Sequence, residues 1–160
     1  MKNQDYLYLD HAASTPMRTS ALEKYVEAES FGFANSSGGH KLSRDSKNLL
    51  EDSREKIAGL FNAAPGEIIF TSGGTEADNW TIKSLFESKK PDDNLVTSNI
   101  EHEAVLASAE WVSINGYQTK YAKSDENGFV SKDEFLNQID DNTKVASLSL
   151  IHISEPTRPC

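Results

Sequence analysis

The sequence predicts an α/β fold with a mainly parallel sheet and flanking helices. Short apolar runs alternate along the chain with longer stretches in which apolar residues recur at helical spacing. Alternation of strand, helix and strand is the pattern from which parallel sheets are built. The chain shows no internal repeat, no low-complexity segment and no obvious linker between domains.

Each element is supported by its local composition. The β-branched run at 67–71 (EIIFT) is typical of a buried strand, and the stretch 42–61 places apolar residues on one side with Glu and Lys between them. Strands are expected at 6–9, 67–71, 95–97, 118–122 and 144–150. Helices are expected at 20–29, 42–61, 76–88, 102–114 and 132–139.

Composition excludes several classes of protein. The 160 residues carry a net charge of −9 with no clustered basic patch, which disfavours a nucleic-acid partner. No apolar run approaches the ~18–20 residues that span a bilayer, and the N-terminus has no signal-peptide core. Cys160 is the single cysteine, so neither a disulfide scaffold nor a cysteine-rich metal site is expected. We therefore expect a soluble, acidic, cytoplasmic protein without a metal or membrane partner.

The most informative loop is the segment 70–79 (FTSGGTEADN), which reads as a strand, a glycine turn and a helix start. Glycines allow backbone N–H groups to approach a ligand, and a helix N-terminus favours a phosphate. The same residue types also serve as plain helix caps, so both interpretations remain open at this point. The segment matches neither the Walker loop nor the dinucleotide-binding fingerprint.

Three further segments are weaker candidates. His102 follows a predicted strand at the carboxyl edge of the sheet, where an imidazole can stack on a flat cofactor and exchange protons. Taken alone, the pattern favours a solvent-facing histidine at a helix start over this role. The segment 8–16 (YLDHAASTP) places small residues after a strand, and Asp10 there fits a turn cap. His40, beside two glycines, also fits an ordinary surface loop.

Together these segments resemble the N-terminal part of a cysteine desulfurase of the NifS/IscS type. These enzymes belong to the class V aminotransferase group and depend on pyridoxal phosphate (fold type I). The resemblance covers about residues 6 to 147. It rests on segments similar to family motifs, of which the phosphate loop is the most specific: 8–16, 31–40, 53–58 (SREKIA), 70–79 and 101–105 (EHEAV).

The resemblance implies roles for three residues. Gly74 and Thr75 would bind the cofactor phosphate, and His102 would stack on the pyridine ring and help to move protons. The intact enzyme would convert L-cysteine to L-alanine and pass the sulfur to an enzyme persulfide, for iron–sulfur clusters or tRNA thiolation. The family also implies a homodimer and sulfur-acceptor proteins. Another class V enzyme, such as a selenocysteine lyase or an aminotransferase, and a non-catalytic phosphate-binding module remain alternatives.

The sequence departs from the family in places. Position 11 is His, Ala34-Asn35 replaces the usual Asn-Pro, and position 43 is Ser where Gly is common. Residues 148–158 (LSLIHISEPTR) match the translation of a transposon-type sequencing adapter, letter for letter. We therefore divide the chain into 1–147, the N-terminal segment with the front part of a truncated cofactor-binding large domain, and 148–160, a non-native tail.

The family's Schiff-base lysine follows a Ser-x-His-Lys motif, which the 160 residues do not contain. The persulfide cysteine of the family lies further on, and Cys160 falls within the suspect tail. The sequence therefore predicts that this chain by itself is inactive as a desulfurase.

Overall fold

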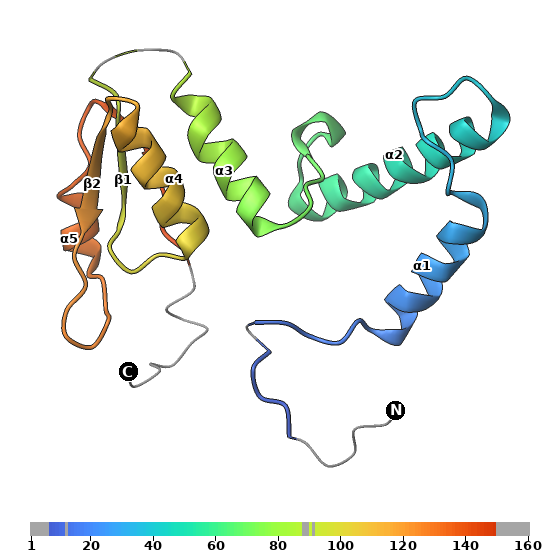
Figure 1. Cartoon of the computed structure of the whole chain (residues 1–160), viewed down its shortest axis with the longest axis horizontal. Helices are drawn as coiled ribbons and strands as arrows, with labels where there is room; N and C mark the ends of the chain where they lie inside the picture. Colours follow the sequence, from blue (N-terminus) through green and yellow to red (C-terminus); the bar gives the residue numbers. More distant parts are fainter. Residues whose placement is uncertain (1–6, 12, 88–89, 91, 150–160) are drawn as a thin grey trace. The chain divides into compact units, whose positions relative to one another are not determined.

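The computed structural model describes residues 7–11, 13–87, 90 and 92–149 (Figure 1). The chain divides into two compact units, residues 1–70 and 71–160, and each is described by itself.

The first unit is helical. It contains α1 (Thr19–Phe31), α2 (Lys41–Phe61) and a short 3₁₀ helix, η1 (Pro65–Glu67). The imidazole of His40 caps the start of α2, and Asn62 ends it in the left-handed conformation at φ 53°. No residue of α1 is buried, and several of its apolar side chains are exposed.

The second unit contains a three-stranded parallel sheet in the order β2-β1-β3. The strands are β1 (Asn94–Ser98), β2 (Gln118–Ala122) and β3 (Thr143–Ala146). All five residues of β1 are buried because the strand is paired on both sides and covered on both faces, as is usual for a central parallel strand.

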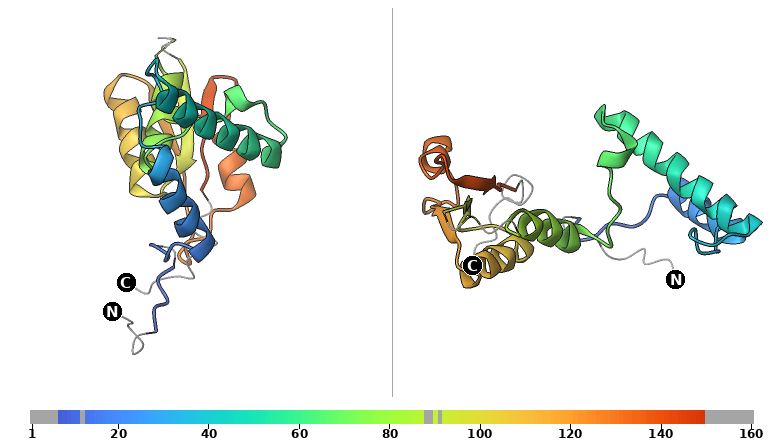
Figure 2. Two further views of the ribbon diagram at one scale, coloured as in Figure 1. Left: turned by 90° about the vertical axis from the view of Figure 1, so that its right-hand side faces the viewer. Right: turned by 90° about the horizontal axis from the view of Figure 1, so that it is seen from above.

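Three helices cover this sheet. They are α3 (Gly74–Leu85), α4 (Glu103–Ile114) and α5 (Lys132–Leu136). The chain passes from β1 to β2 through α4 and returns past β1 to β3 through α5, so right-handed connections require α4 and α5 to cover opposite faces. Figures 1 and 2 show this arrangement, with α3 beside α4 on one face.

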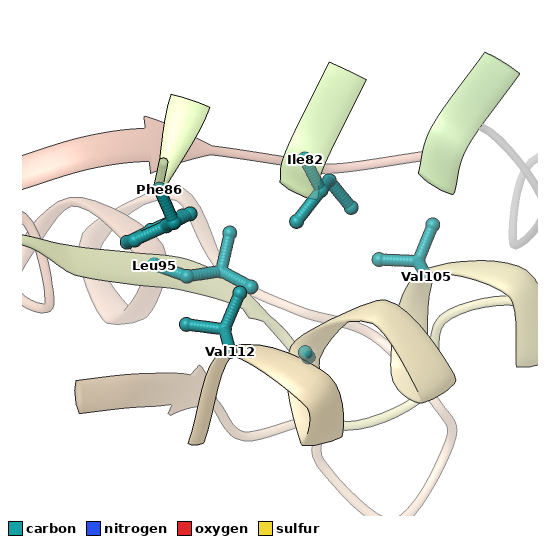
Figure 3. Packing of buried hydrophobic residues seen from close by; sticks show 6 residues of the cluster. Ile82, Phe86, Leu95, Val105 and Val112 are labelled. Atoms are coloured by element: carbon teal, nitrogen blue, oxygen red, sulfur yellow. The ribbon is translucent and has the colours of Figure 1, made fainter. Parts of the chain in front are cut away.

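The core of the second unit lies between α3, α4 and β1. Side chains from α3, β1 and α4 interdigitate there (Figure 3). The buried cluster comprises Ile82, Phe86, Leu95, Val105, Ala109 and Val112. This core fixes the relative positions of α3 and α4, and therefore of the loops that begin them.

Most predicted elements are confirmed. The expected strands at 95–97 and 118–122 coincide with β1 and β2, and all five expected helices are present within a few residues of their predicted ends. The last strand starts at Thr143 and ends at Ala146, rather than spanning 144–150. The predicted fold class, α/β with a parallel sheet and flanking helices, is confirmed.

Two predicted strands are wrong. Residues 7–9 and 68–71 form no regular secondary structure, and Ile69 and Phe70 are 58% and 43% exposed. A strand is stable only beside a partner, and no described residue pairs with either segment. The Ile68 carbonyl instead accepts a hydrogen bond from the guanidinium of Arg54, which lies 4.8 Å from the centre of the Phe70 ring.

Among the described residues, no helix is both long and apolar enough to cross a membrane. Tyr6, Ser88 and residues 150–160 lie outside the described part of the chain; they belong to the predicted strands 6–9 and 144–150, the predicted helix 76–88 and the predicted tail.

Candidate functional site

The first turn of α3 presents unused backbone donors. Gly73 precedes the helix in an extended conformation and makes no side-chain cap, and the first helical bond runs from the Ala77 amide to the Gly73 carbonyl at 3.1 Å. Within the described structure, the Gly74 and Thr75 amides find no acceptor. Such amides at a helix N-terminus, together with the helix dipole, favour an anion.

The space in front of this turn is open. A methyl group built on Gly73 or Gly74 would meet no heavy atom within 4 Å, so a ligand atom can approach the backbone closely. The exposed Thr75 hydroxyl has no partner among the described side chains, and it adds a third donor beside the two amides. This donor set fits a phosphate group.

Glu76 holds the loop before α3 in place. Its carboxylate accepts the Ser72 amide at 2.6 Å, and the Thr71 hydroxyl donates to the Gly73 carbonyl at 3.1 Å. The bonds from the backbone and hydroxyl of Ser72 hold the pKa of Glu76 below its ordinary value. Glu76 therefore engages the Ser72 amide and leaves the amides of Gly74 and Thr75 available.

His102 stands at the start of α4. Its Nδ1 accepts the Ala104 amide at 3.1 Å, so the imidazole caps the helix and its ring is exposed. A ring nitrogen that accepts a hydrogen bond carries no proton, which places the hydrogen of the neutral ring on Nε2. The ring is thus held at one end and free to present an Nε2–H at the other.

The two helix starts lie at the same end of the sheet. In Figure 1, α3 and α4 both begin at the lower end, where β1 finishes, and the buried cluster packs the two helices side by side. Gly74, Thr75 and His102, which the sequence singled out, therefore share the carboxyl edge of the sheet, where α/β proteins bind ligands.

The other candidate segments belong to the first unit. The Tyr8 hydroxyl closes its own loop by bonding to the Asp10 carbonyl at 2.7 Å and the Ser14 carbonyl at 3.1 Å, and its ring meets His11 edge-on. His40 is a helix cap: its Nδ1 accepts the Ser43 amide at 3.3 Å. These contacts give both segments local structural roles within the first unit.

Sequence reasoning missed two acidic residues at this edge. Glu76 holds the loop before α3, and Glu101 is 6% exposed although it directly precedes the exposed His102. Glu76 could have been recognised as an acid in the first turn of a helix, a common capping position. No sequence signal separates a buried Glu101 from a solvent-facing one. Among the described residues, no group of three or more potential ligands could hold a metal ion.

Comparison with known proteins identifies the family. The model of the family described as aminotransferase class-V matches residues 7–154, which is most of the chain. The chain belongs to this family.

The relatives narrow the resemblance to cysteine desulfurases. The chain is 37% identical over 143 residues to cysteine desulfurase IscS of Methanosarcina thermophila, a match covering 89% of this chain and 35% of that protein. It is 39% identical over 138 residues to putative cysteine desulfurase IscS 1 of Bacillus subtilis, covering 86% and 36% respectively. The chain thus spans about a third of the length of these relatives.

Two solved structures support the same assignment. A NifS-like protein superimposes with a TM-score of 0.78 at 31% identity, over 85% of this chain and 38% of that one. A structure of SspA in complex with cysteine superimposes with a TM-score of 0.79 at 33% identity, over 88% and 41%. The predicted resemblance to cysteine desulfurases and the predicted fold are both confirmed.

Proposed function

We propose that this chain carries the phosphate-binding and ring-contacting part of a pyridoxal-phosphate-dependent cysteine desulfurase. The observation that carries the proposal is the pair of helix starts at one edge of the sheet, with free donors at Gly74 and Thr75 and an exposed imidazole at His102. The substrate would be L-cysteine, as supported by similarity to desulfurases and to a structure described as a complex with cysteine.

Gly74 and Thr75 would bind the phosphate, and His102 would handle the proton. The amides of Gly74 and Thr75 and the Thr75 hydroxyl would hold the phosphate, and Glu76 would keep the loop in its receptive shape. His102 would contact the ring face and offer the Nε2 position for a proton, because Nδ1 is engaged by the Ala104 amide. Bound pyridoxal phosphate supplies an electron sink for carbanion chemistry.

Other parts of the proposal concern the intact enzyme. A homodimer, a sulfur-acceptor or scaffold protein and a cytoplasmic location follow from the resemblance to the desulfurases. The chain covers about a third of those relatives, so these properties belong to the whole enzyme and are proposed with it.

The phosphate site can be tested on this chain with pyridoxine 5′-phosphate, which lacks the aldehyde and so does not react with surface lysines. Thr75→Val removes the hydroxyl at nearly constant shape and should weaken binding about tenfold or more, because a hydrogen bond to a charged group is lost. Thr81→Val, an exposed position on the same helix, is the matched control and should bind as the wild type does.

Dissociation constants can be measured by isothermal titration calorimetry, with pyridoxine as the ligand that lacks the phosphate. Equal weakening by both valine variants, or equal affinity for the ligands with and without phosphate, would contradict the assignment of the phosphate site.

A further inference from the structure

Glu101 is a buried acid in the loop that joins β1 to α4. It is 6% exposed, and one of its carboxylate oxygens, Oε2, is fully buried with no hydrogen-bond partner among the described residues. Burying an unpaired carboxylate oxygen costs free energy, so a site that keeps one is under some other constraint. The role proposed above for this edge of the sheet does not use Glu101.

The other oxygen, Oε1, ties three segments together. It accepts the hydroxyl of Ser98, the last residue of β1, at 3.0 Å, and the backbone amide of Ser149 at 3.0 Å. The chain that continues from β3 also pairs with β1, because the Ser147 amide donates to the Val96 carbonyl at 2.9 Å. Glu101 therefore fastens the loop before α4 to the β3 side of the sheet.

Asn99 fastens the same loop to the β2 side. Its amide donates to the Ala122 carbonyl at 3.0 Å, and its side-chain oxygen accepts the Ser124 amide at 2.8 Å. The loop has only four residues between β1 and α4, so two anchors leave its last residue, His102, little freedom. His102 then caps α4 through Ala104 and is also fixed from the helix side.

We propose that Glu101 is a positioning residue for His102: its buried carboxylate, held by Ser98 and by the backbone at 149, sets the place and orientation of the imidazole at the carboxyl edge of β1. This inference rests on the proposed function only for the use to which the oriented ring is put. The placement of His102 by Glu101 depends on residues of this chain alone.

The anchor at 149 is compatible with the predicted boundary at 147/148. Glu101 contacts the main-chain N–H of Ser149 and not its side chain. Any residue except proline offers that donor, so a different native residue at 149 would preserve the contact.

The test compares three substitutions of Glu101 by nuclear magnetic resonance on the chain without ligand. Glu101→Ala removes the acceptor, Glu101→Asp keeps the charge but shortens the reach by one methylene, and Glu101→Gln keeps an acceptor at full length. The control is Asp140→Ala, which removes a carboxylate at the opposite end of the same strands, where Asp140 binds Lys120 and Asn94.

Two signals report on His102: the Nδ1 resonance of its imidazole, and hydrogen exchange of the Ala104 amide that it caps. Exchange is compared with that of the Val112 amide in the same helix, which corrects for overall stability. We expect Glu101→Ala and Glu101→Asp to shift the Nδ1 resonance and to speed relative exchange at Ala104 about threefold or more, as for the loss of one hydrogen bond. Glu101→Gln and Asp140→Ala should leave both signals near the wild type.

Wild-type signals in the aspartate variant, or an equal change in Asp140→Ala, would overturn the proposal, as would a glutamine variant that behaves like the alanine variant. If the alanine variant does not fold, the aspartate and glutamine variants still decide the question. Because no cofactor is used, failure of this test is distinct from failure of the phosphate-site titration.

Discussion

At the scale of single residues, the edge of the sheet combines two kinds of group. Gly74 and Thr75 expose donors because a helix start cannot satisfy its own amides, whereas Glu76 and Glu101 are acceptors that fix the loops before the two helices. The carboxylate of Glu76 holds the turn before α3 through the Ser72 amide, without a ligand. In the proposed function, Gly74 and Thr75 bind the ligand, and Glu76 and Glu101 position the loops.

The brace by Glu76 predicts a pH response of the loop. The bonds from Ser72 lower the pKa of Glu76 in the folded state, so the stabilisation they provide is present above the ordinary value of 4.5 and is lost as the pH falls through the lower folded-state pKa. The Ser72 amide resonance should therefore titrate with a midpoint below 4.5.

The Ser72→Ala variant keeps the hydrogen bond from the Ser72 amide to Glu76 and removes only the weaker bond from the Ser72 hydroxyl. The titration midpoint of Glu76 in this variant should therefore move part of the way toward the ordinary value of 4.5. A wild-type midpoint at or above 4.5 would show that the carboxylate does not hold the loop.

Part of this site could be predicted from sequence. The residue pattern predicted the glycine turn at a helix start and placed His102 at the next helix start, whereas the roles of Gly74 and Thr75 came from the resemblance to the desulfurases. The bracing role of Glu76 and the burial of Glu101 could not be predicted, because they depend on which atoms of the sheet and loops face each carboxylate. The stacking role of His102 stays a prediction.

At the scale of elements, the second unit follows its sequence pattern closely. The runs that became β1 and β2 find partners within the described chain, and α3 and α4 supply the apolar side chains that cover them. The run at 67–71 is also rich in β-branched residues, but residues 68–71 have no partner strand in the described part of the chain and remain irregular, while Glu67 ends the 3₁₀ helix η1. Propensity alone does not fix a strand, since its stability comes from pairing and burial.

A polar network joins the other end of the three strands. Asp140 accepts hydrogen bonds from Lys120 in β2, from the Asn94 side chain in β1 and from the Asn142 amide, and these bonds hold its pKa well below the usual range. Asp140→Ala should lower the melting temperature, because Asn94 and Lys120 lose their shared acceptor.

The control is Asp141→Ala, the neighbouring exposed acid, which should melt near the wild-type temperature. The difference between the two variants should be fully present at neutral pH and should shrink as the pH falls below the ordinary value of 3.8, because the unfolded chain then takes up a proton that the folded Asp140, with its lowered pKa, does not. Equal melting temperatures at neutral pH would show that the network does not stabilise the sheet.

At the scale of the whole molecule, two units are joined between Phe70 and Thr71, just before the turn that leads into α3. The first unit exposes large apolar side chains, among them Leu60 and Phe61 at 84% and 74%. The chain belongs to the aminotransferase class-V family and spans about a third of its desulfurase relatives. The activity proposed for the intact enzyme therefore draws on more than these two units.

The boundary between residues 1–147 and the tail at 148–160 stays a prediction, because residues 150–160 lie outside the described part of the chain. Resequencing the gene from genomic DNA checks it. We expect the coding sequence to diverge from the adapter translation after codon 147; a genomic read that continues through codon 160 unchanged would show that the tail is native.

In the proposed function, the starts of α3 and α4 together form one site for a phosphorylated pyridine ring. The most direct measurement is a titration of the isotope-labelled chain with pyridoxine 5′-phosphate, followed by nuclear magnetic resonance and repeated with inorganic phosphate. We predict that the amides of Gly74 and Thr75 respond to both ligands, and that the imidazole of His102 shifts only with the ring-bearing ligand, at the same midpoint as the two amides. Shifts confined to other residues, or a His102 that does not respond to the ring, would contradict the account.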